Sequence, residues 1–456
     1  MEQRLPSRPP FTIRASILTP LAAGGTRFEA DAHLSVGHDG RIDRITPAGG
    51  SEPTGHPDIG PVVDLRPWLV LPGMIDLHAH LPQIPNAGVG AGLPLLDWLR
   101  RYIFPLEEAF DEPTAEVLAP AAFRAFARGG TTTAVLYGAV YKPSLHAAFR
   151  AAETHGIRAV IGKVMMDRVT YDDRLPRDRI LDVSLQQSAD LCQRWHGRDG
   201  GRLRYAFTPR FAVSCSREML RQSAALARQT GAYWQSHLAE DRGELAEVAR
   251  LFPEAHDYLD VYDRAGALGD RTILAHAIHL SDREVARLAE SGARLAHCPA
   301  SNLFLASGIM PLARYLDAGI PVGLGSDVAA GPDLSLFTAM RIGAYTQNAL
   351  RMTIGDPHPI LDPLGWLRMG TLEGARTLGT DDAAGSLEEG KEADLIAVDT
   401  TLTWPLPDVR PRGQEQERDP GDPMEIMSRL IYRSHPAMVR GAWVRGHLLD
   451  AGRHPS

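Results

Sequence analysis

The chain has 456 residues, of which 44% are hydrophobic and 23% are charged. These proportions are typical of a folded protein with a large core, and they exclude a disordered or collagen-like chain. There are 48 Lys and Arg residues against 56 Asp and Glu residues, and the net charge of −8 without a basic block argues against nucleic-acid binding. Three scattered cysteines are too few for a disulfide framework and indicate a reducing compartment. Since we find neither a signal peptide nor an apolar run long enough to span a membrane, we expect a cytoplasmic protein.

The central part of the chain alternates short apolar runs with amphipathic segments, from about residue 70 to residue 330. This alternation is typical of repeated strand and helix units that build a parallel sheet. We count eight strand-like runs, the number that a closed (β/α)8 TIM-like barrel requires. The runs are residues 69–80, 131–138, 157–166, 204–212, 232–240, 271–279, 293–301 and 322–330.

Two of the intervening segments are predicted to be helices with defined ends. Residues 216–231 and 281–292 each begin at a serine and end at a glycine. In the second segment, Ser281 and Glu284 match the S-x-x-E capping box, and Gly292 suits the left-handed residue that follows a helix.

The two ends of the chain contain short strand-like runs, such as FTIRASILTP near the N-terminus and GKEADLIAVD near the C-terminus. Neither end is long enough to bury a core alone. We therefore predict that residues 1–66 and 385–456 together form one small β-sandwich beside a catalytic barrel of residues 67–384. The segment 404–423, rich in proline and charge, is predicted to be a surface loop.

Histidine and aspartate side chains fall near the carboxyl ends of four predicted barrel strands. His78 and His80 end the first strand, His237 ends the fifth, His276 lies on the sixth, and Asp327 ends the eighth. A single histidine is more often an ordinary core or surface residue. However, the carboxyl ends of barrel strands form one active-site face, so these five side chains are expected to converge. Three imidazoles and one carboxylate suit Zn²⁺ or Fe²⁺ and leave a position for water.

Glu240 follows His237 by three residues in the run SHLAE. A carboxylate just beyond a metal ligand is placed to shuttle a proton of the attacking water, provided that the pocket raises its pKa. The alternative is that Glu240 is an ordinary glutamate at a helix N-terminus. We favour the catalytic role, with His276 and Asp327 orienting the water and stabilising the developing oxyanion.

The runs that carry these residues, PGMIDLHAH, SHLAED, ILAHAIH and GLGSD, resemble the strand motifs of the amidohydrolase superfamily. Further runs, including HAHLPQ, LPLLDWLRRYIFPLEEAF, TPRFAVSCS and HCPASN, are similar to those of the guanine deaminases within it. The resemblance extends from about residue 60 to residue 400. It implies a zinc-dependent hydrolase that acts on the C–N bonds of cyclic amidines and converts guanine to xanthine and ammonia.

Carried over by motif, the resemblance implies one zinc ion bound by His78, His80, His237 and Asp327, with Glu240, His276 and Asp327 in catalytic roles. It also implies that the small purine base is bound by Gln83, Arg210 and Phe211, and that the enzyme is a homodimer. The planar fork of arginine independently matches the O6 and N7 acceptors of guanine. The alternative for Arg210 is an ion pair with a carboxylate at the rim.

Lys163 lies on the third predicted strand, whereas the bridging lysine of two-metal relatives belongs on the fourth, which ends in Arg210. We therefore interpret Lys163 as structural and the site as mononuclear. The first rival function is deamination or dechlorination of another aminoheterocycle, such as a pterin, an s-triazine or an adenine derivative. The second is a non-catalytic scaffold on the same fold, which the complete ligand set argues against.

Overall fold

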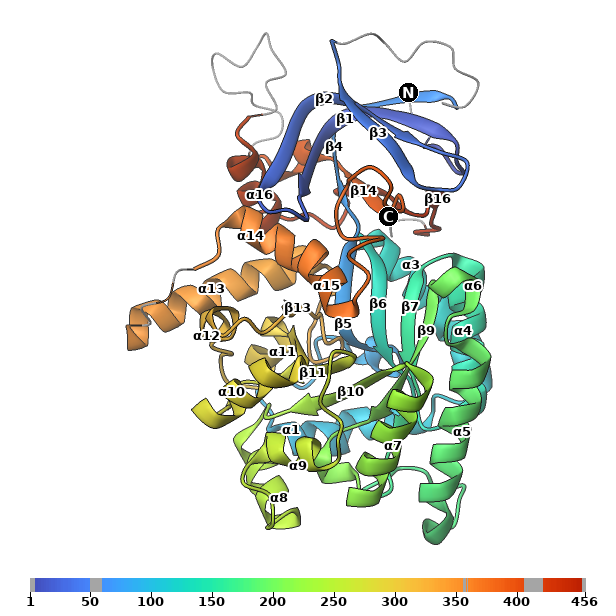
Figure 1. The fold of residues 1–456 in the computed structure, drawn as a ribbon, viewed down its shortest axis with the longest axis vertical. Helices are drawn as coiled ribbons and strands as arrows, with labels where there is room; N and C mark the ends of the chain where they lie inside the picture. The colour runs from blue at the N-terminus through green and yellow to red at the C-terminus, as the bar shows by residue number, and fades with distance from the viewer. Residues whose placement is uncertain (1–4, 50–59, 356–357, 359, 406–420, 453–456) are drawn as a thin grey trace.

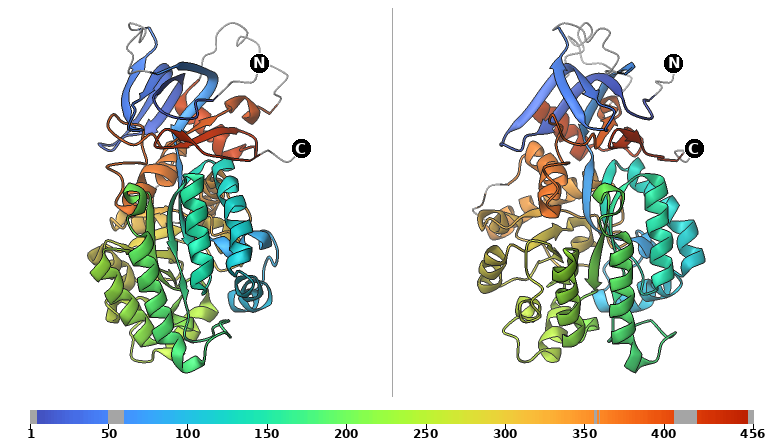
Figure 2. Two further views of the ribbon diagram at one scale, coloured as in Figure 1. Left: turned by 90° about the vertical axis from the view of Figure 1, so that its right-hand side faces the viewer. Right: turned by 45° about the vertical axis from the view of Figure 1, so that its right-hand side comes forward.

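The computed structural model describes residues 5–49, 60–355, 358, 360–405 and 421–452 (Figure 1). Two bodies are apparent in the ribbon, a barrel surrounded by helices and a twisted sheet at one end of it (Figure 2). Most of the predicted surface loop 404–423 lies outside the described residues. None of the helices in the described part of the chain combines the length and the apolar character needed to cross a bilayer.

The barrel consists of eight parallel strands in the described residues, as the sequence predicts, and they follow one another in chain order around it. Apolar side chains from these strands, among them Leu77, Val135 and Ile273, fill the interior. The strands are β5 (Met74–His80), β6 (Thr131–Tyr137), β7 (Arg158–Gly162), β9 (Leu203–Pro209), β10 (Tyr233–Leu238), β11 (Thr272–His276), β12 (Arg294–His297) and β13 (Val322–Leu324), with the short β8 (Val164–Met165) pairing beside β9.

The first and last strands of the barrel meet through polar contacts of Asp76. Its carboxylate accepts hydrogen bonds from the backbone N–H of His78 at 3.2 Å, the backbone N–H of Ser326 at 2.9 Å and the Ser326 hydroxyl at 2.5 Å. The backbone N–H of Asp327 donates to the carbonyl of His78 at 2.7 Å. This junction brings the end of β5 against the residues that follow β13.

The two terminal segments pair with each other, as predicted, but they form one continuous seven-stranded sheet and not two packed sheets. This sheet curves around an apolar core of its own. Its spatial order is β16, β15, β14, β4, β1, β2, β3. The strands are β1 (Phe11–Pro20), β2 (Thr26–Val36), β3 (Ile42–Pro47), β4 (Val62–Pro72), β14 (Leu395–Val398), β15 (Val439–Val444) and β16 (His447–Leu448).

The strand expected at 69–80 is divided at Gly73 between the two bodies. Leu69 to Pro72 pair with β14 in the terminal sheet, so this sheet extends beyond residue 66, where we placed its first segment's end. A Cβ at residue 73 would lie 2.0 Å from the Thr132 hydroxyl. Glycine therefore allows the chain to pass closely from the sheet into the barrel.

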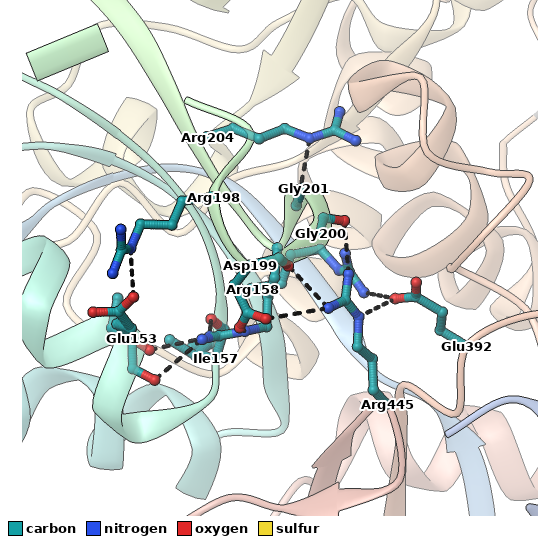
Figure 3. Close-up of polar contacts among 12 residues, drawn as sticks. Glu153, Ile157, Arg158, Arg198, Asp199, Gly200, Gly201, Arg204, Glu392 and Arg445 are labelled. Atoms are coloured by element: carbon teal, nitrogen blue, oxygen red, sulfur yellow. Dashed lines mark hydrogen bonds and ion pairs between the residues drawn. The ribbon is translucent and has the colours of Figure 1, made fainter. Parts of the chain in front are cut away.

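A network of buried charges joins the sheet to the barrel at the amino ends of the strands (Figure 3). Arg158, the first residue of β7, pairs with both Glu392 and Asp394. Arg445 donates to Glu392 at 2.9 Å and to the carbonyl oxygens of Asp199 and Gly200. Since buried charges are costly unless they are paired, this network fixes how the two bodies dock.

Helices cover the outside of the barrel, and both predicted helix boundaries are confirmed. Ser216 and Ser281 cap α7 and α10, Ser281 and Glu284 form the capping box, and Gly231 and Gly292 are left-handed. The helices are α1 (Leu95–Trp98), α2 (Phe104–Glu108), α3 (Glu112–Arg128), α4 (Lys142–His155), α5 (Ile180–Trp195), α6 (Arg198–Gly201), α7 (Arg217–Thr230), α8 (Arg242–Leu251), α9 (Tyr258–Arg264), α10 (Asp282–Ser291), α11 (Pro299–Phe304), α12 (Leu312–Asp317), α13 (Leu336–Ile354), α14 (Pro363–Arg368), α15 (Gly374–Leu378) and α16 (Pro423–Tyr432).

Candidate active site

The histidine and aspartate side chains singled out in the sequence converge at the carboxyl ends of the barrel strands. His78 Nε2 lies 3.2 Å and His80 Nε2 3.5 Å from Asp327 Oδ1. The Nε2 atoms of His80 and His237 are 3.2 Å apart. His276 Nε2 lies 3.7 Å from Asp327 Oδ2. The structure thus brings together, from four strands, all five residues that the spacing predicts.

A bulge in β5 is part of this convergence. The register against β6 shifts between the pairs Asp76–Ala134 and Ala79–Leu136, so β5 holds one more residue than its neighbour over this stretch. The extra residue lets Leu77 fill the barrel interior while His78 and His80 reach the rim together. Bulges commonly redirect side chains in this way beside active sites.

Two of the converging residues have backbone angles that side chains rarely adopt. His276 has φ of 73° and Asp327 has φ of 48°, both in the left-handed region. Neither residue is glycine, so the surrounding structure must hold these conformations against their local cost, which is about 1–3 kcal/mol each. Such strain is characteristic of sites where side-chain direction matters more than local stability.

The protonation states of the cluster suit a cation. Burial, together with the neighbouring imidazoles, lowers the pKa of His80 and His237 well below the usual value, so both rings are neutral near pH 7. His237 Nδ1 lies 2.6 Å from the carbonyl of Arg210, which therefore accepts its N–H and leaves the Nε2 lone pair facing the cluster. Although burial opposes ionisation of Asp327, the imidazoles of His78 and His276 lower its pKa overall.

The arrangement of donors fits a divalent metal ion. The ligand atoms of His78, His80 and His237 lie within 4.8 Å of one another, as do those of His78, His276 and Asp327. Among the described residues, the buried Nε2 atoms of His78 and His276 have no hydrogen-bond partner. Buried polar atoms are rarely left unsatisfied, and neutral imidazoles with a carboxylate are the ligands that Zn²⁺ and Fe²⁺ prefer.

Glu240 lies beside this cluster with the properties of a proton carrier. Its Oε2 is 3.5 Å from His276 Nε2, and its backbone N–H donates to Glu244 Oε2 at 2.9 Å, which anchors the loop after β10. Burial and the nearby charge of Asp327 raise the pKa of Glu240 well above the usual value. A carboxyl group with a raised pKa can both accept and release a proton near neutral pH.

A pocket opens onto these groups. The predicted substrate-binding residues Gln83, Arg210 and Phe211 line it together with His80, His237, Glu240 and Asp327. The apolar part of its wall comes from Leu95, Trp98, Leu99, Leu305 and Ala330. The pocket therefore combines a metal-ligand cluster, an acid–base group and polar groups for orienting a small flat molecule.

Arg210 makes the ion pair that the sequence left open as an alternative, but it still lines the pocket. Its Nη1 donates to Glu107 Oε2, and its guanidinium lies 5.4 Å from the centre of the Phe104 ring. Burial alone would lower the pKa of Arg210, but the charge and hydrogen bond of Glu107 raise it overall. The guanidinium is thus held as a permanent cation in the wall of the pocket.

Lys163 lies apart from the pocket lining, in agreement with a structural role. It follows β7, the third barrel strand, while Arg210 follows β9, the fourth. Its Nζ donates to the Ser184 hydroxyl at 2.9 Å and to the Val164 carbonyl at 3.4 Å. Burial lowers the pKa of Lys163 to about 7.

Sequence reasoning missed four residues that support the site. Asn302 Oδ1 accepts from His276 Nδ1 at 2.9 Å, and the buried ring of Tyr137 lies edge-on or tilted to three of the histidine rings, with centroids within 5 Å. Asp76 closes the barrel beside His78, and Glu107 holds Arg210. Except for Tyr137, which ends the second barrel strand, these residues lie within runs already quoted for their resemblance, but no spacing rule distinguishes them.

The chain matches the Amidohydrolase family over residues 69–449. The chain belongs to the amidohydrolase family. Among its relatives in this family, the guanine deaminase of Escherichia coli strain K12 is 35% identical over 363 residues, which cover 78% of each protein.

Solved structures of family members agree with this assignment over nearly the whole chain. The E. coli guanine deaminase structure superimposes with a TM-score of 0.87 at 30% identity and covers 96% of this chain and 99% of that one. A guanine deaminase from C. acetobutylicum with bound guanine in its active site gives a TM-score of 0.86 at 28% identity, with the same coverage. Both the (β/α)8 barrel and the terminal sheet are therefore shared with these two structures.

Proposed function

We propose that this amidohydrolase is a guanine deaminase, which hydrolyses guanine to xanthine and ammonia. The observation that carries the proposal is the composition of the pocket, where a metal-ligand cluster and Glu240 face Gln83, Arg210 and Phe211. The similarity to guanine deaminases over most of the chain supports the choice of substrate.

His78, His80, His237 and Asp327 would hold the metal, for which we propose one zinc ion per chain, with Fe²⁺ as the alternative. The metal, when bound, supplies a water molecule that is acidic enough to lose a proton near neutral pH. His237 is preset for this role because its other ring nitrogen is occupied by the Arg210 carbonyl. We also propose a cytoplasmic homodimer. The apolar segment near the C-terminus could have supplied its interface, but Met427 and Leu430 of α16 are buried within the chain.

Glu240 accounts for the proton movements of the reaction. It accepts a proton from the attacking water as the C2–O bond forms and the C2=N3 double bond opens, and it delivers that proton to N3. It then takes the remaining proton of the added hydroxyl and passes it to the amino group as the C2–N bond breaks, the C2=O bond forms and ammonia leaves. Its raised pKa suits both steps. His276, held by Asn302, lies 3.5 Å from Glu240 and, together with Asp327, would orient the attacking water, while its imidazole would stabilise negative charge on the oxygen that adds to C2.

Gln83, Arg210 and Phe211 would bind the purine. Arg210 offers hydrogen-bond donors to O6 and N7 of the purine. Phe211 offers an aromatic ring beside His237, and the centroids of these two rings are 6.4 Å apart. These residues, rather than the metal ligands, separate guanine from other rings that the same chemistry could attack.

The test is ammonia release from guanine, adenine, cytosine, pterins and s-triazines by protein whose metal content has been measured. We expect guanine to be the preferred substrate, with xanthine formed in equal amount to ammonia. Turnover of another ring without turnover of guanine would contradict the proposal, and protein without bound metal or any hydrolysis would favour a scaffold.

A further inference from the structure

One buried carboxylate, Glu107, contacts both polar residues that we assign to the purine. Gln83 Nε2 donates to Glu107 Oε1 at 2.7 Å, and Arg210 Nη1 donates to Glu107 Oε2. The Glu107 residue is 0% exposed and lies on α2, one helical turn after Phe104, over whose ring Arg210 lies. The same short helix therefore fixes the position and the direction of both side chains.

This contact determines which end of the Gln83 amide faces the pocket. A carboxylate only accepts hydrogen bonds, so the NH₂ group of Gln83 must point toward Glu107. Its carbonyl oxygen is then left as an acceptor for the pocket, since Gln83 Oε1 has no hydrogen-bond partner among the described residues. The donors of Arg210 other than Nη1 are likewise left for the pocket.

We infer that Glu107 is a positioning residue that selects substrates with a ring N–H next to a carbonyl. This inference rests on the proposed function, because it concerns the residues proposed to bind guanine. The fixed pair presents one acceptor and one set of cationic donors side by side. Guanine offers the complementary edge, N1–H beside O6, whereas a ring with an amino group at position 6 offers an unprotonated N1 beside a donor.

A mismatched ring would place two acceptors together and two donors together in a buried pocket. Leaving buried polar groups unpaired is strongly unfavourable, and sites built on such hydrogen bonds reject the wrong analogue by large factors. Glu107 thus contributes to selectivity without touching the substrate.

The Glu107→Gln variant reverses this pattern. The charged Arg210 would retain the amide oxygen of residue 107, so the new NH₂ group would face Gln83 and require Gln83 to turn its oxygen toward it. Gln83 would then present a donor to the pocket. We expect kcat/KM for guanine to fall about 100-fold, while 2,6-diaminopurine, which keeps the amino group at C2 but has an unprotonated N1, is much less affected.

The double variant Gln83→Glu with Glu107→Gln restores an acceptor at residue 83 and a donor at residue 107. We expect it to recover at least about tenfold of the lost preference for guanine over 2,6-diaminopurine. The matched control is Glu108→Gln, which changes the neighbouring exposed glutamate and should leave both substrates unaffected. Equal losses on the two substrates in Glu107→Gln, or no recovery in the double variant, would overturn the inference.

Thermal unfolding of the ligand-free variants tests the contact without any substrate. Gln83→Glu alone sets two buried carboxylates against each other and should lower the unfolding midpoint, and adding Glu107→Gln should raise it again. Additive losses would contradict the inference. If the wild-type protein releases no ammonia from guanine, the proposed function fails, and this unfolding cycle still decides whether Glu107 orients Gln83.

Discussion

At the amino ends of the barrel strands, Arg158 is buried against Glu392 and Asp394, whereas at the carboxyl ends His78 and His276 each keep a buried ring nitrogen without a hydrogen-bond partner among the described residues. Both regions concentrate polar groups in the interior. In the first, opposite charges satisfy one another and join two parts of the fold. In the second, lone pairs converge on one point. The difference indicates that paired buried charge marks architecture and that converging unpaired polarity marks a ligand site.

The largest effect is expected at the carboxyl ends, from Glu240→Gln. This change removes the proton carrier but none of the proposed metal ligands, so kcat should fall about 10³-fold or more while the metal content stays at the wild-type level. Steady-state kinetics and elemental analysis of the same preparation check both parts. Near-normal turnover would remove Glu240 from the mechanism, and loss of metal would give it a different role.

The next largest effect is expected at the amino ends, from Arg158→Met. The change leaves Glu392 and Asp394 buried without their main partner, and we expect the free energy of unfolding to fall by about 3–5 kcal/mol. Denaturant unfolding measures this loss, and kcat of the folded fraction should be unchanged. The control Arg150→Met breaks the exposed pairs with Glu112 and Glu116 and should cost no more than about 1 kcal/mol. Equal losses in the two variants would mean that burial of the network adds nothing.

Lys163 tests a buried amine that forms no ion pair within the described residues, where the charge of Asp172 only partly offsets the effect of burial. Burial lowers its pKa from 10.5 to about 7, so between these values the unfolded chain binds a proton that the folded chain does not. Stability should therefore rise with pH from about 7 to about 10, with a slope of at most about 1.4 kcal/mol per pH unit.

Below pH 7 both states of Lys163 are protonated, and the full cost of burying the charge is present. Denaturant unfolding at several pH values, compared between wild type and Lys163→Met, isolates this contribution. The variant should be more stable than wild type at pH 6, with the difference shrinking as the pH rises. A difference that does not change with pH would show that Lys163 is not buried as a neutral amine.

The smallest effect is expected at the first turn of α10, whose capping residue Ser281 belongs neither to the pocket lining nor to the charge network. Ser281→Ala removes the side chain that accepts from the backbone N–H of Glu284, and it should cost about 1 kcal/mol of unfolding free energy. Activity should not change. A loss of activity with this variant would mean that the helix is coupled to the rim in a way that the structure does not indicate.

The sequence predicted the eight strands and the convergence of His78, His80, His237, His276 and Asp327, because alternating apolar runs and the carboxyl ends of strands follow simple periodic rules. It did not predict the bulge in β5, since an extra residue in a strand has no distinct pattern in a single sequence. It also did not assign Glu107, whose role depends on α2 folding back over the first strand's end. The contacts that position catalytic groups come from tertiary structure, which spacing along the chain does not encode.

The most direct test of the account is a metal titration of the metal-depleted protein, followed by xanthine formation from guanine. We predict that activity rises linearly with added Zn²⁺ and reaches its plateau at one ion per chain, and that Asp327→Asn abolishes this response. Full activity in the metal-depleted protein, or no guanine turnover at any metal content, would contradict the account.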